Sequence, residues 1–240
     1  MSVVARSARW SPARVATALA LGAWAAVFWT LLVTGRTYLY LSSRTAWLVP
    51  LGAVIFSVGA LGRLATARTV HDEPLDRRSA WTLGAITLPV VLVLALPPAT
   101  LGTYSVGKRA TFGGSAIGAT ARDVTGPLDF VDVGAAQSFP TAMRELQDRY
   151  GESITLEGFV TKEASEPDQI LLTRYIVTCC VADATVAQVH IVGLDTSQYT
   201  DDEWLQVTGA VYPFQRDVFV QSDPDSAVQI PVPDQPYLTP

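Results

Sequence analysis

The residues best suited to chemistry are Cys179 and Cys180, which are adjacent and are the only two cysteines among 240 residues. Asp183 follows three positions after Cys180. Thiolates bind soft metal ions and act as nucleophiles, and a carboxylate can complete a zinc site. Cys179, Cys180 and Asp183 are therefore the candidate metal ligands of this chain, with zinc or another soft metal ion as the candidate cofactor.

Four interpretations of the cysteine pair stay open at this point. The thiols can be buried structural groups, ligands of a soft metal, partners in redox chemistry, or sites of a bond to another chain. In a regular strand the side chains of Cys179 and Cys180 point to opposite faces. A shared metal, or a disulfide between the neighbours, therefore needs a local distortion, which the turn at residues 182–184 can supply.

Other residues do not extend this site into an enzyme centre. If the flanking strands form a hairpin centred on Asp183, His190 lies opposite Ile176, four residues or about 13 Å along the strand from Cys180. Asp183 is near enough to contribute a ligand, although Asp in a tight turn usually accepts backbone hydrogen bonds. The sequence lacks a Ser-His-Asp order, a phosphate-binding loop and paired catalytic carboxylates. We therefore expect no enzyme activity, no catalytic residues and no bound organic cofactor.

The chain divides into two parts of opposite charge. Residues 1–100 contain nine Arg and three acidic residues, whereas the rest contains eight basic and nineteen acidic residues, which gives net charges of +6 and −11. This asymmetry predicts a two-part protein. The acidic part disfavours nucleic acid as a partner, because phosphate binding needs a cationic surface.

The first part, residues 1–98, is predicted to be a transmembrane helical region. Its three apolar stretches, at residues 15–34, 46–64 and 80–98, are each near the ~20 residues that a helix needs to cross a hydrocarbon core of ~30 Å. None contains an acidic residue or Lys, and Arg residues stand near their ends. Charge inside a membrane span usually marks an ion or proton path. We therefore expect these helices to anchor the chain in the lipid bilayer and to dock on a partner rather than to form a pore.

The distribution of Arg predicts the orientation of the spans. A signal peptide is disfavoured for the first span, because its apolar run exceeds the usual ~7–15 residues and no Ala-x-Ala cleavage pattern follows. Arg residues are more numerous before the first span and around the second loop than in the first loop. By the positive-inside rule we expect a multi-pass protein of the cell membrane, with a cytoplasmic N-terminus and an extracytoplasmic C-terminal domain.

A flexible linker is expected at residues 99–127, which are rich in Gly, Ala, Ser and Thr. In the domain that follows, residues 128–240, we expect a short strand at 130–133 and a helix at 138–150, which Ser138 caps and Gly151 ends. Alternating apolar residues then predict strands at 154–160, 170–180, 186–192, 204–212 and 217–221, and a short run near 228–230. The expected turns lie at 166–168, 195–203 and 222–225.

Five short strands in roughly 80 residues predict an OB-like all-β barrel. Gly158 and Gly209 stand in mid-strand, where a glycine permits the sharp bend that a small barrel needs. The fold class is therefore an α+β membrane protein, in which about three transmembrane helices precede an OB-like β domain with one short helix. A fold of this kind does not choose a function.

The residues around the cysteine pair resemble a known family. The stretch from Tyr175 to Ala184 is similar to the Cys-Cys-x-Ala-Asp-Ala signature of the YcgQ-like bacterial membrane proteins, which are described as predicted permease subunits. The segments 154–160, 204–211 and 236–238 resemble that family's Gly-Phe-Val strand, Trp-Val-x-Val-x-Gly strand and C-terminal close. Residues 40–44 resemble its Tyr-Leu-x-x-Arg stretch, with Ser43 where relatives often have Pro.

This resemblance implies an accessory subunit of a larger multi-span permease, and some relatives look linked to metal homeostasis. It assigns no catalytic residue that can be transferred to this chain. We therefore expect an accessory membrane subunit whose outer domain contacts the substrate or the partner in transport. The alternative is an extracytoplasmic metal-binding or redox protein that works through the thiols of Cys179 and Cys180.

Overall fold

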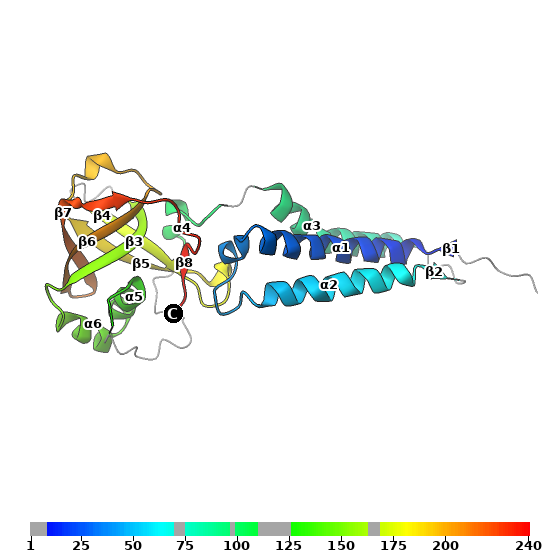
Figure 1. The fold of residues 1–240 in the computed structure, drawn as a ribbon, viewed down its shortest axis with the longest axis horizontal. Helices are drawn as coiled ribbons and strands as arrows, with labels where there is room; N and C mark the ends of the chain where they lie inside the picture. Colours follow the sequence, from blue (N-terminus) through cyan, green and yellow to red (C-terminus); the bar gives the residue numbers. More distant parts are fainter. Residues whose placement is uncertain (1–8, 70–74, 97–98, 110–125, 163–168) are drawn as a thin grey trace, which may run out of the picture. The chain divides into compact units, whose positions relative to one another are not determined.

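The computed structural model describes residues 9–69, 75–96, 99–109, 126–162 and 169–240 (Figure 1). The chain forms two compact units. The helical unit comprises residues 1–37 and 46–99, and the barrel unit comprises residues 38–45 and 100–240. The loop between the first two long helices, Tyr38–Thr45, is therefore part of the barrel unit.

The helical unit contains three long helices, as the sequence predicts. Each is long and apolar enough to cross a membrane. They are α1 (Pro12–Val33), α2 (Leu48–Ala65) and α3 (Arg77–Ala95), and two short strands, β1 (Arg9–Trp10) and β2 (Arg68–Thr69), pair antiparallel beside them. The helices begin two or three residues away from the expected spans.

Local capping fixes where α1 and α3 begin. The Ser11 side chain accepts a hydrogen bond from the Arg14 amide, and Pro12 occupies the first turn of α1, where its missing N–H has no cost. The Asp76 carboxylate accepts from the Ser79 amide at 3.0 Å and caps α3. Because α3 begins at Arg77, its first turn contains Arg77 and Arg78, two of the Arg residues on which the predicted orientation rests.

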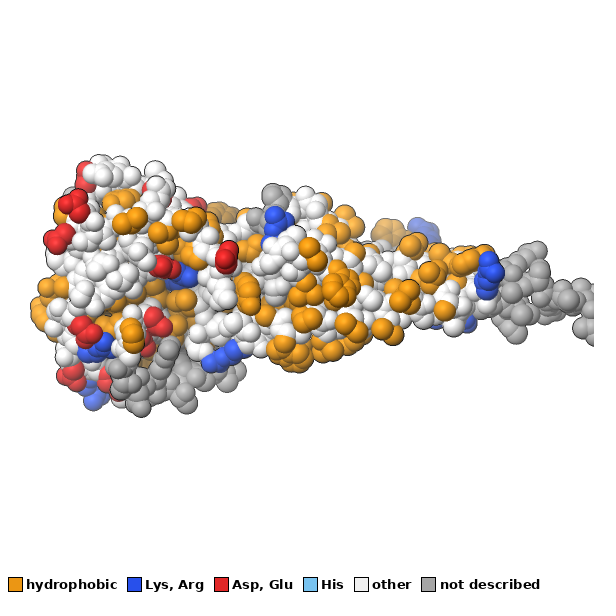
Figure 2. Space-filling view, viewed as in Figure 1, with side chains coloured by type: hydrophobic (Ala, Val, Ile, Leu, Met, Phe, Trp, Pro, Cys, Tyr) orange, Lys and Arg blue, Asp and Glu red, His pale blue; other side chains and the backbone are white. Residues whose placement is uncertain are grey.

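Most of the apolar surface of the helices is exposed. In Figure 2 hydrophobic side chains cover much of the visible face of α1–α3, whereas Asp and Glu side chains gather on the barrel unit. The exposed side chains are large aliphatic and aromatic groups, among them Leu19, Val33, Val58, Leu61, Trp81 and Leu88. Such a surface needs lipid or a partner helix to cover it.

The barrel unit contains a closed five-stranded β-barrel, which confirms the predicted fold class. Its strands are β3 (Ser153–Thr161), β4 (Ile170–Ile176), β5 (Thr185–Val192), β6 (Trp204–Phe214) and β7 (Asp217–Gln229). They pair in the order β3-β6-β7-β5-β4, and β4 pairs back to β3. All pairs are antiparallel except β5 with β7, which is the closure of an OB-fold.

Two helices, α5 (Phe130–Ser138) and α6 (Pro140–Gln147), pack against the barrel and share its hydrophobic core. Their apolar side chains pack with those of the strands, as Val133 and Leu146 do with Leu172 and Val189, all fully buried. The expected strand at 130–133 is therefore wrong. The Asp129 carboxylate accepts from two amides of the next residues and forms a capping box, which starts a helix there.

Three other boundaries differ from the expectation. The helix expected at 138–150 is α6, and Ser138 ends α5 instead of capping α6. The second strand ends at Ile176 instead of residue 180. β7 continues through 222–225, because its pairing with β6 jumps from Ser222 to Ala227 and absorbs the expected turn as a bulge. The expected turn at 166–168 lies outside the described residues.

The expected linker contains an ordered part. Residues 101–109, with the short helix α4 (Thr103–Val106), lie on the barrel. The Leu101 amide donates to the Tyr237 hydroxyl at 2.9 Å, and the Thr103 hydroxyl donates to the Val160 carbonyl at 3.2 Å. Residues 110–125 of that linker lie outside the described residues.

The barrel closure predicts a large cost for a side chain at Gly158. A Cβ atom there would lie 2.7 Å from the Thr173 carbonyl oxygen and 3.0 Å from Leu172. We expect Gly158→Ala to destabilise the barrel by about 1–3 kcal/mol, because backbone must move to admit the methyl group. Thermal unfolding of the full chain in detergent measures the change. Gly107→Ala is the matched control, since no atom lies within 4 Å of its Cβ position, and equal unfolding temperatures for the two variants would contradict the prediction.

Candidate functional site

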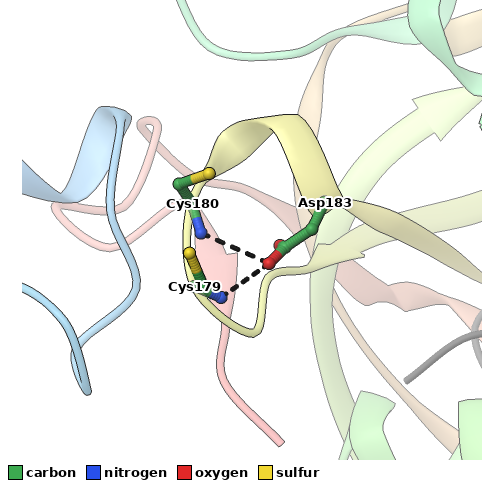
Figure 3. Close-up of side chains that lie close together, drawn as sticks. All are labelled: Cys179, Cys180 and Asp183. Atoms are coloured by element: carbon green, nitrogen blue, oxygen red, sulfur yellow. Dashed lines mark hydrogen bonds between the residues drawn. The ribbon is translucent and has the colours of Figure 1, made fainter. Parts of the chain in front are cut away.

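The two cysteines lie in the turn that joins β4 to β5. The turn continues as a single 3₁₀ turn, Val181–Asp183, before β5 begins. The Cys179 side chain is exposed and that of Cys180 is half-buried. Because the strand has already ended, the alternation that would separate the thiols does not apply. One ligand atom each from Cys179, Cys180 and Asp183 lies within 4.8 Å of the others (Figure 3).

Asp183 builds this turn with its carboxylate. Oδ1 accepts from the Thr178 amide at 3.1 Å, and Oδ2 accepts from the amides of Cys179 at 2.8 Å and Cys180 at 3.4 Å. In return, the Cys180 side chain accepts from the Asp183 amide. Figure 3 shows the carboxylate directed at the backbone nitrogens of both cysteines. The carboxylate therefore takes the place of a neighbouring strand, which is why β4 ends before the cysteines.

The loop Tyr38–Thr45 forms the other side of the turn. Leu41 and Cys180 form an antiparallel bridge, the Val181 amide donates to the Tyr40 carbonyl at 2.9 Å, and the Ser42 amide donates to the Cys179 carbonyl at 3.2 Å. The two segments are about 140 residues apart in the chain. No local pattern in the sequence predicts this contact, which is the main feature of the site that sequence reasoning missed.

Two hydroxyl groups of the loop complete the contact. The Ser42 hydroxyl, in a buried side chain, donates to the Thr178 carbonyl at 2.9 Å. The Thr45 hydroxyl donates to the Cys179 carbonyl. The Arg109 guanidinium donates to the Val181 and Ala182 carbonyls at 2.9 and 3.0 Å. The backbone of the turn is thus held by the Asp183 carboxylate, by the loop Tyr38–Thr45 and by Arg109, while Cys179 is exposed and Cys180 is half-buried.

A buried aromatic cluster places Arg109. It consists of seven side chains that include Tyr175, Trp204 and Tyr237. The Tyr175 hydroxyl donates to the Gly102 carbonyl at 2.9 Å, which holds the segment that leads to Arg109. Burial raises the pKa of Tyr175 to about 12, so this hydroxyl keeps its proton at any physiological pH.

Arg174, next to Tyr175 on β4, fixes the C-terminal segment to the same cluster. Its guanidinium donates to the carbonyls of Glu157, Gln235 and Pro236 at 2.8 to 3.1 Å and lies over the Trp204 ring. Burial lowers its pKa to about 10, which still leaves it charged at neutral pH. Together these contacts hold β8 (Tyr237–Leu238) beside the end of β4. We therefore assign Arg174 a structural role.

His190 lies away from the thiol turn. It stands on β5 opposite Leu171, and its ring stacks on Phe219 with centroids 4.7 Å apart. Its Nδ1 is 3.2 Å from the Gln169 side-chain oxygen. The hairpin register assumed from the sequence is therefore wrong, since Ile176 pairs with Thr185. The other histidine of the chain, His71, lies outside the described residues.

The Cys180 thiol affects the pKa of Cys179. The pKa of the Cys179 thiol is raised above its ordinary value, chiefly by its hydrogen bond with the Cys180 thiol and by repulsion from the charged form of Cys180. The Asp183 carboxylate adds to this increase. A ligand that binds both sulfur atoms must therefore displace their protons.

The arrangement can hold a metal ion. Within the part of the chain that the structure describes, Cys179, Cys180 and Asp183 are the group of thiols and carboxylates close enough to share one. Thiolate donors suit a soft metal ion. The side-chain geometry does not identify the ion, and zinc is one of the soft metals that it admits.

Comparison with known proteins gives one match. Residues 136–239 match the family model described as the DUF1980 C-terminal domain. This segment contains the five barrel strands and the thiol turn, and the description of the family names no activity. None of the curated proteins and none of the solved structures matches the chain.

The raised pKa of Cys179 predicts how its reactivity depends on Cys180. In Cys180→Ser the second titrating thiol is gone, while the new hydroxyl can still accept from the Asp183 amide. We expect the pKa of Cys179 to fall, so the midpoint of its pH–rate profile with iodoacetamide moves to lower pH than in the unaltered protein. In the mirror variant Cys179→Ser only Cys180 can react with iodoacetamide, so it gives the part of the measured rate that is due to Cys180. A midpoint in Cys180→Ser at or above that of the unaltered protein would show that the thiols do not interact.

Proposed function

We propose that this protein is a non-enzymatic accessory subunit of a larger multi-span permease, in which the barrel unit contacts the partner or the transported solute. The observation that carries this proposal is the exposed apolar surface of α1–α3. In addition, the expected spans contain no ionisable residue apart from the Arg residues at their ends. A helix set of this kind can anchor and dock. It offers no charged side chain for an ion path.

The match of residues 136–239 to the DUF1980 C-terminal domain is compatible with a membrane accessory protein. The resemblance to the YcgQ-like family supports the finer assignment, a permease partner and a connection with metal homeostasis. The Cys-Cys-x-Ala-Asp-Ala motif that carries this resemblance is the thiol turn of the barrel unit.

We assign the N-terminus to the cytoplasm and the barrel unit to the outside of the cell membrane. The distribution of Arg supports this orientation. A second argument comes from Tyr38–Thr45, which joins α1 to α2 and belongs to the barrel unit. A loop and the domain that it is part of must face the same side of the bilayer. Three spans satisfy that requirement. The chain emerges from the first span and from the third span on the same side of the bilayer, so the first loop and the barrel unit face the same side.

A second function, thiol-dependent metal binding, is favoured by the geometry of the turn. The ligand atoms of Cys179, Cys180 and Asp183 lie within 4.8 Å of one another, and Cys179 is exposed. An accessory subunit can hold a metal ion at such a site during transport, so the two functions are compatible. Vicinal thiols can also carry out redox chemistry, which metal analysis and thiol titration of the full chain distinguish from metal binding.

The accessory role predicts a membrane partner on the exposed helix faces. We expect a photo-crosslinking residue at Val58, which is 64% exposed on α2, to capture a many-span membrane protein in native membranes. The same residue at Ala53, which is fully buried on α2, is the matched control and is expected to react only within the chain. Mass spectrometry of the products identifies the captured chain. Recovery of the Val58 variant with lipid adducts alone would contradict the accessory role.

A further inference from the structure

The backbone oxygen atoms of the thiol turn are already used. The carbonyls of Thr178 and Cys179 accept from the loop hydroxyls of Ser42 and Thr45. The carbonyl of Cys180 accepts from the Asp183 amide at 2.9 Å. The next two carbonyls along the chain accept from Arg109. Each of these carbonyls is oriented by the hydrogen bond that it accepts, so turning it toward a metal ion would weaken the contacts that hold the turn.

The oxygen atoms of the Asp183 carboxylate also accept hydrogen bonds within the turn. Its two oxygen atoms accept three backbone amides, and those bonds hold Cys179 and Cys180 in the turn. Moving the carboxylate to a metal ion would release the amides and undo the arrangement that brings the thiols together. The hard oxygen donors of the turn are therefore engaged in the hydrogen bonds that shape it. The Cys179 sulfur is exposed, and the half-buried Cys180 sulfur accepts from the Asp183 amide (Figure 3).

Two sulfur atoms are too few for a complete zinc site. Structural zinc takes four protein ligands and catalytic zinc takes three. The chain has no further cysteine, and His190 lies on the remote part of β5 opposite Leu171. Soft thiolate ligands also select Cu(I), and a monovalent soft ion accepts two sulfur ligands in a nearly linear arrangement. The donor set therefore fits a low-coordinate soft cation better than zinc.

We infer that Cys179 and Cys180 form a two-sulfur site for a soft monovalent cation of the Cu(I) type, and that Asp183, Ser42 and Thr45 are positioning residues rather than ligands. The inference rests on the proposed metal-binding function and specifies its ion and its ligands. Binding replaces the proton of each thiol with a bond to the cation, so two protons are released and no oxidation takes place. Because Cys179 is exposed, a thiol or thioether of another protein can reach the ion, as transfer to a partner requires.

Metal competition with the full chain in detergent micelles tests the inference. Cu(I), kept reduced under anaerobic conditions, and Zn²⁺ are each titrated against a chromophoric chelator. We expect one Cu(I) per chain, which excess Zn²⁺ does not displace, and X-ray absorption of the loaded protein should show sulfur neighbours without oxygen. Cys179→Ser and Cys180→Ser are each expected to abolish this two-sulfur signature.

Variants of Asp183 separate a positioning residue from a ligand. We expect Asp183→Ala to weaken Cu(I) binding by about 10- to 100-fold, as loss of an outer-shell partner does, and Asp183→Asn to weaken it less, because the amide oxygen still accepts. The absorption spectrum of the bound ion should be the same in both variants. Asp195→Asn is the matched control: Asp195 caps another 3₁₀ turn of the barrel unit through the Ser197 amide. This change should leave binding unaltered.

The possible outcomes distinguish the two-sulfur Cu(I) site from the metal-binding function on which it rests. An oxygen neighbour that disappears in Asp183→Asn would make Asp183 a ligand and overturn the inference, while metal binding itself would stand. Zn²⁺ that displaces Cu(I) would do the same. If neither ion binds to the unaltered chain, both the inference and the metal-binding function fail. The accessory role is tested separately by crosslinking at Val58.

Discussion

The site depends on one interaction, the acceptance of three consecutive backbone amides by the Asp183 carboxylate. These amides, of Thr178, Cys179 and Cys180, would otherwise seek the partners of a continuing strand. Because a carboxylate supplies the acceptors, β4 ends at Ile176 and the chain turns. The alternation that sends neighbouring side chains to opposite faces ends with the strand. The two thiols can then share one ligand, which a strand would forbid.

The rest of the barrel unit holds that turn in place. The OB-like closure sets the ends of β4 and β5, and the aromatic cluster with Arg174 fixes the segments on either side. Arg109, on one of these segments, donates to the Val181 carbonyl of the turn, and Leu41 of the loop Tyr38–Thr45 pairs with Cys180. This loop is continuous in sequence with α1 and α2, and hydrogen bonds join it to the thiol turn.

Local patterns in the sequence predict most of the fold. The three long helices and the five barrel strands follow from apolar run length and from alternation, because each is decided within about twenty residues. The apolar run 130–133 predicts a strand, but the capping box of Asp129 and Asp132 starts α5 there instead. The contact of Leu41 with Cys180 could not be predicted, because its partners are far apart in the chain and neither segment is regular. The candidate ligands were found by residue type, but their geometry depends on the Asp183 hydrogen bonds.

The account requires that the thiol turn is exposed on the outer side of the membrane. The chain offers a direct measurement, because its two cysteines both lie in this turn. Intact cells that produce the protein are treated briefly with a mild reductant and then with a membrane-impermeant maleimide, and the labelled chain is quantified before and after permeabilisation. We predict full labelling of Cys179 in intact cells, and no labelling in the variant that lacks both cysteines. Labelling that appears only after permeabilisation would place the barrel unit in the cytoplasm and contradict the account.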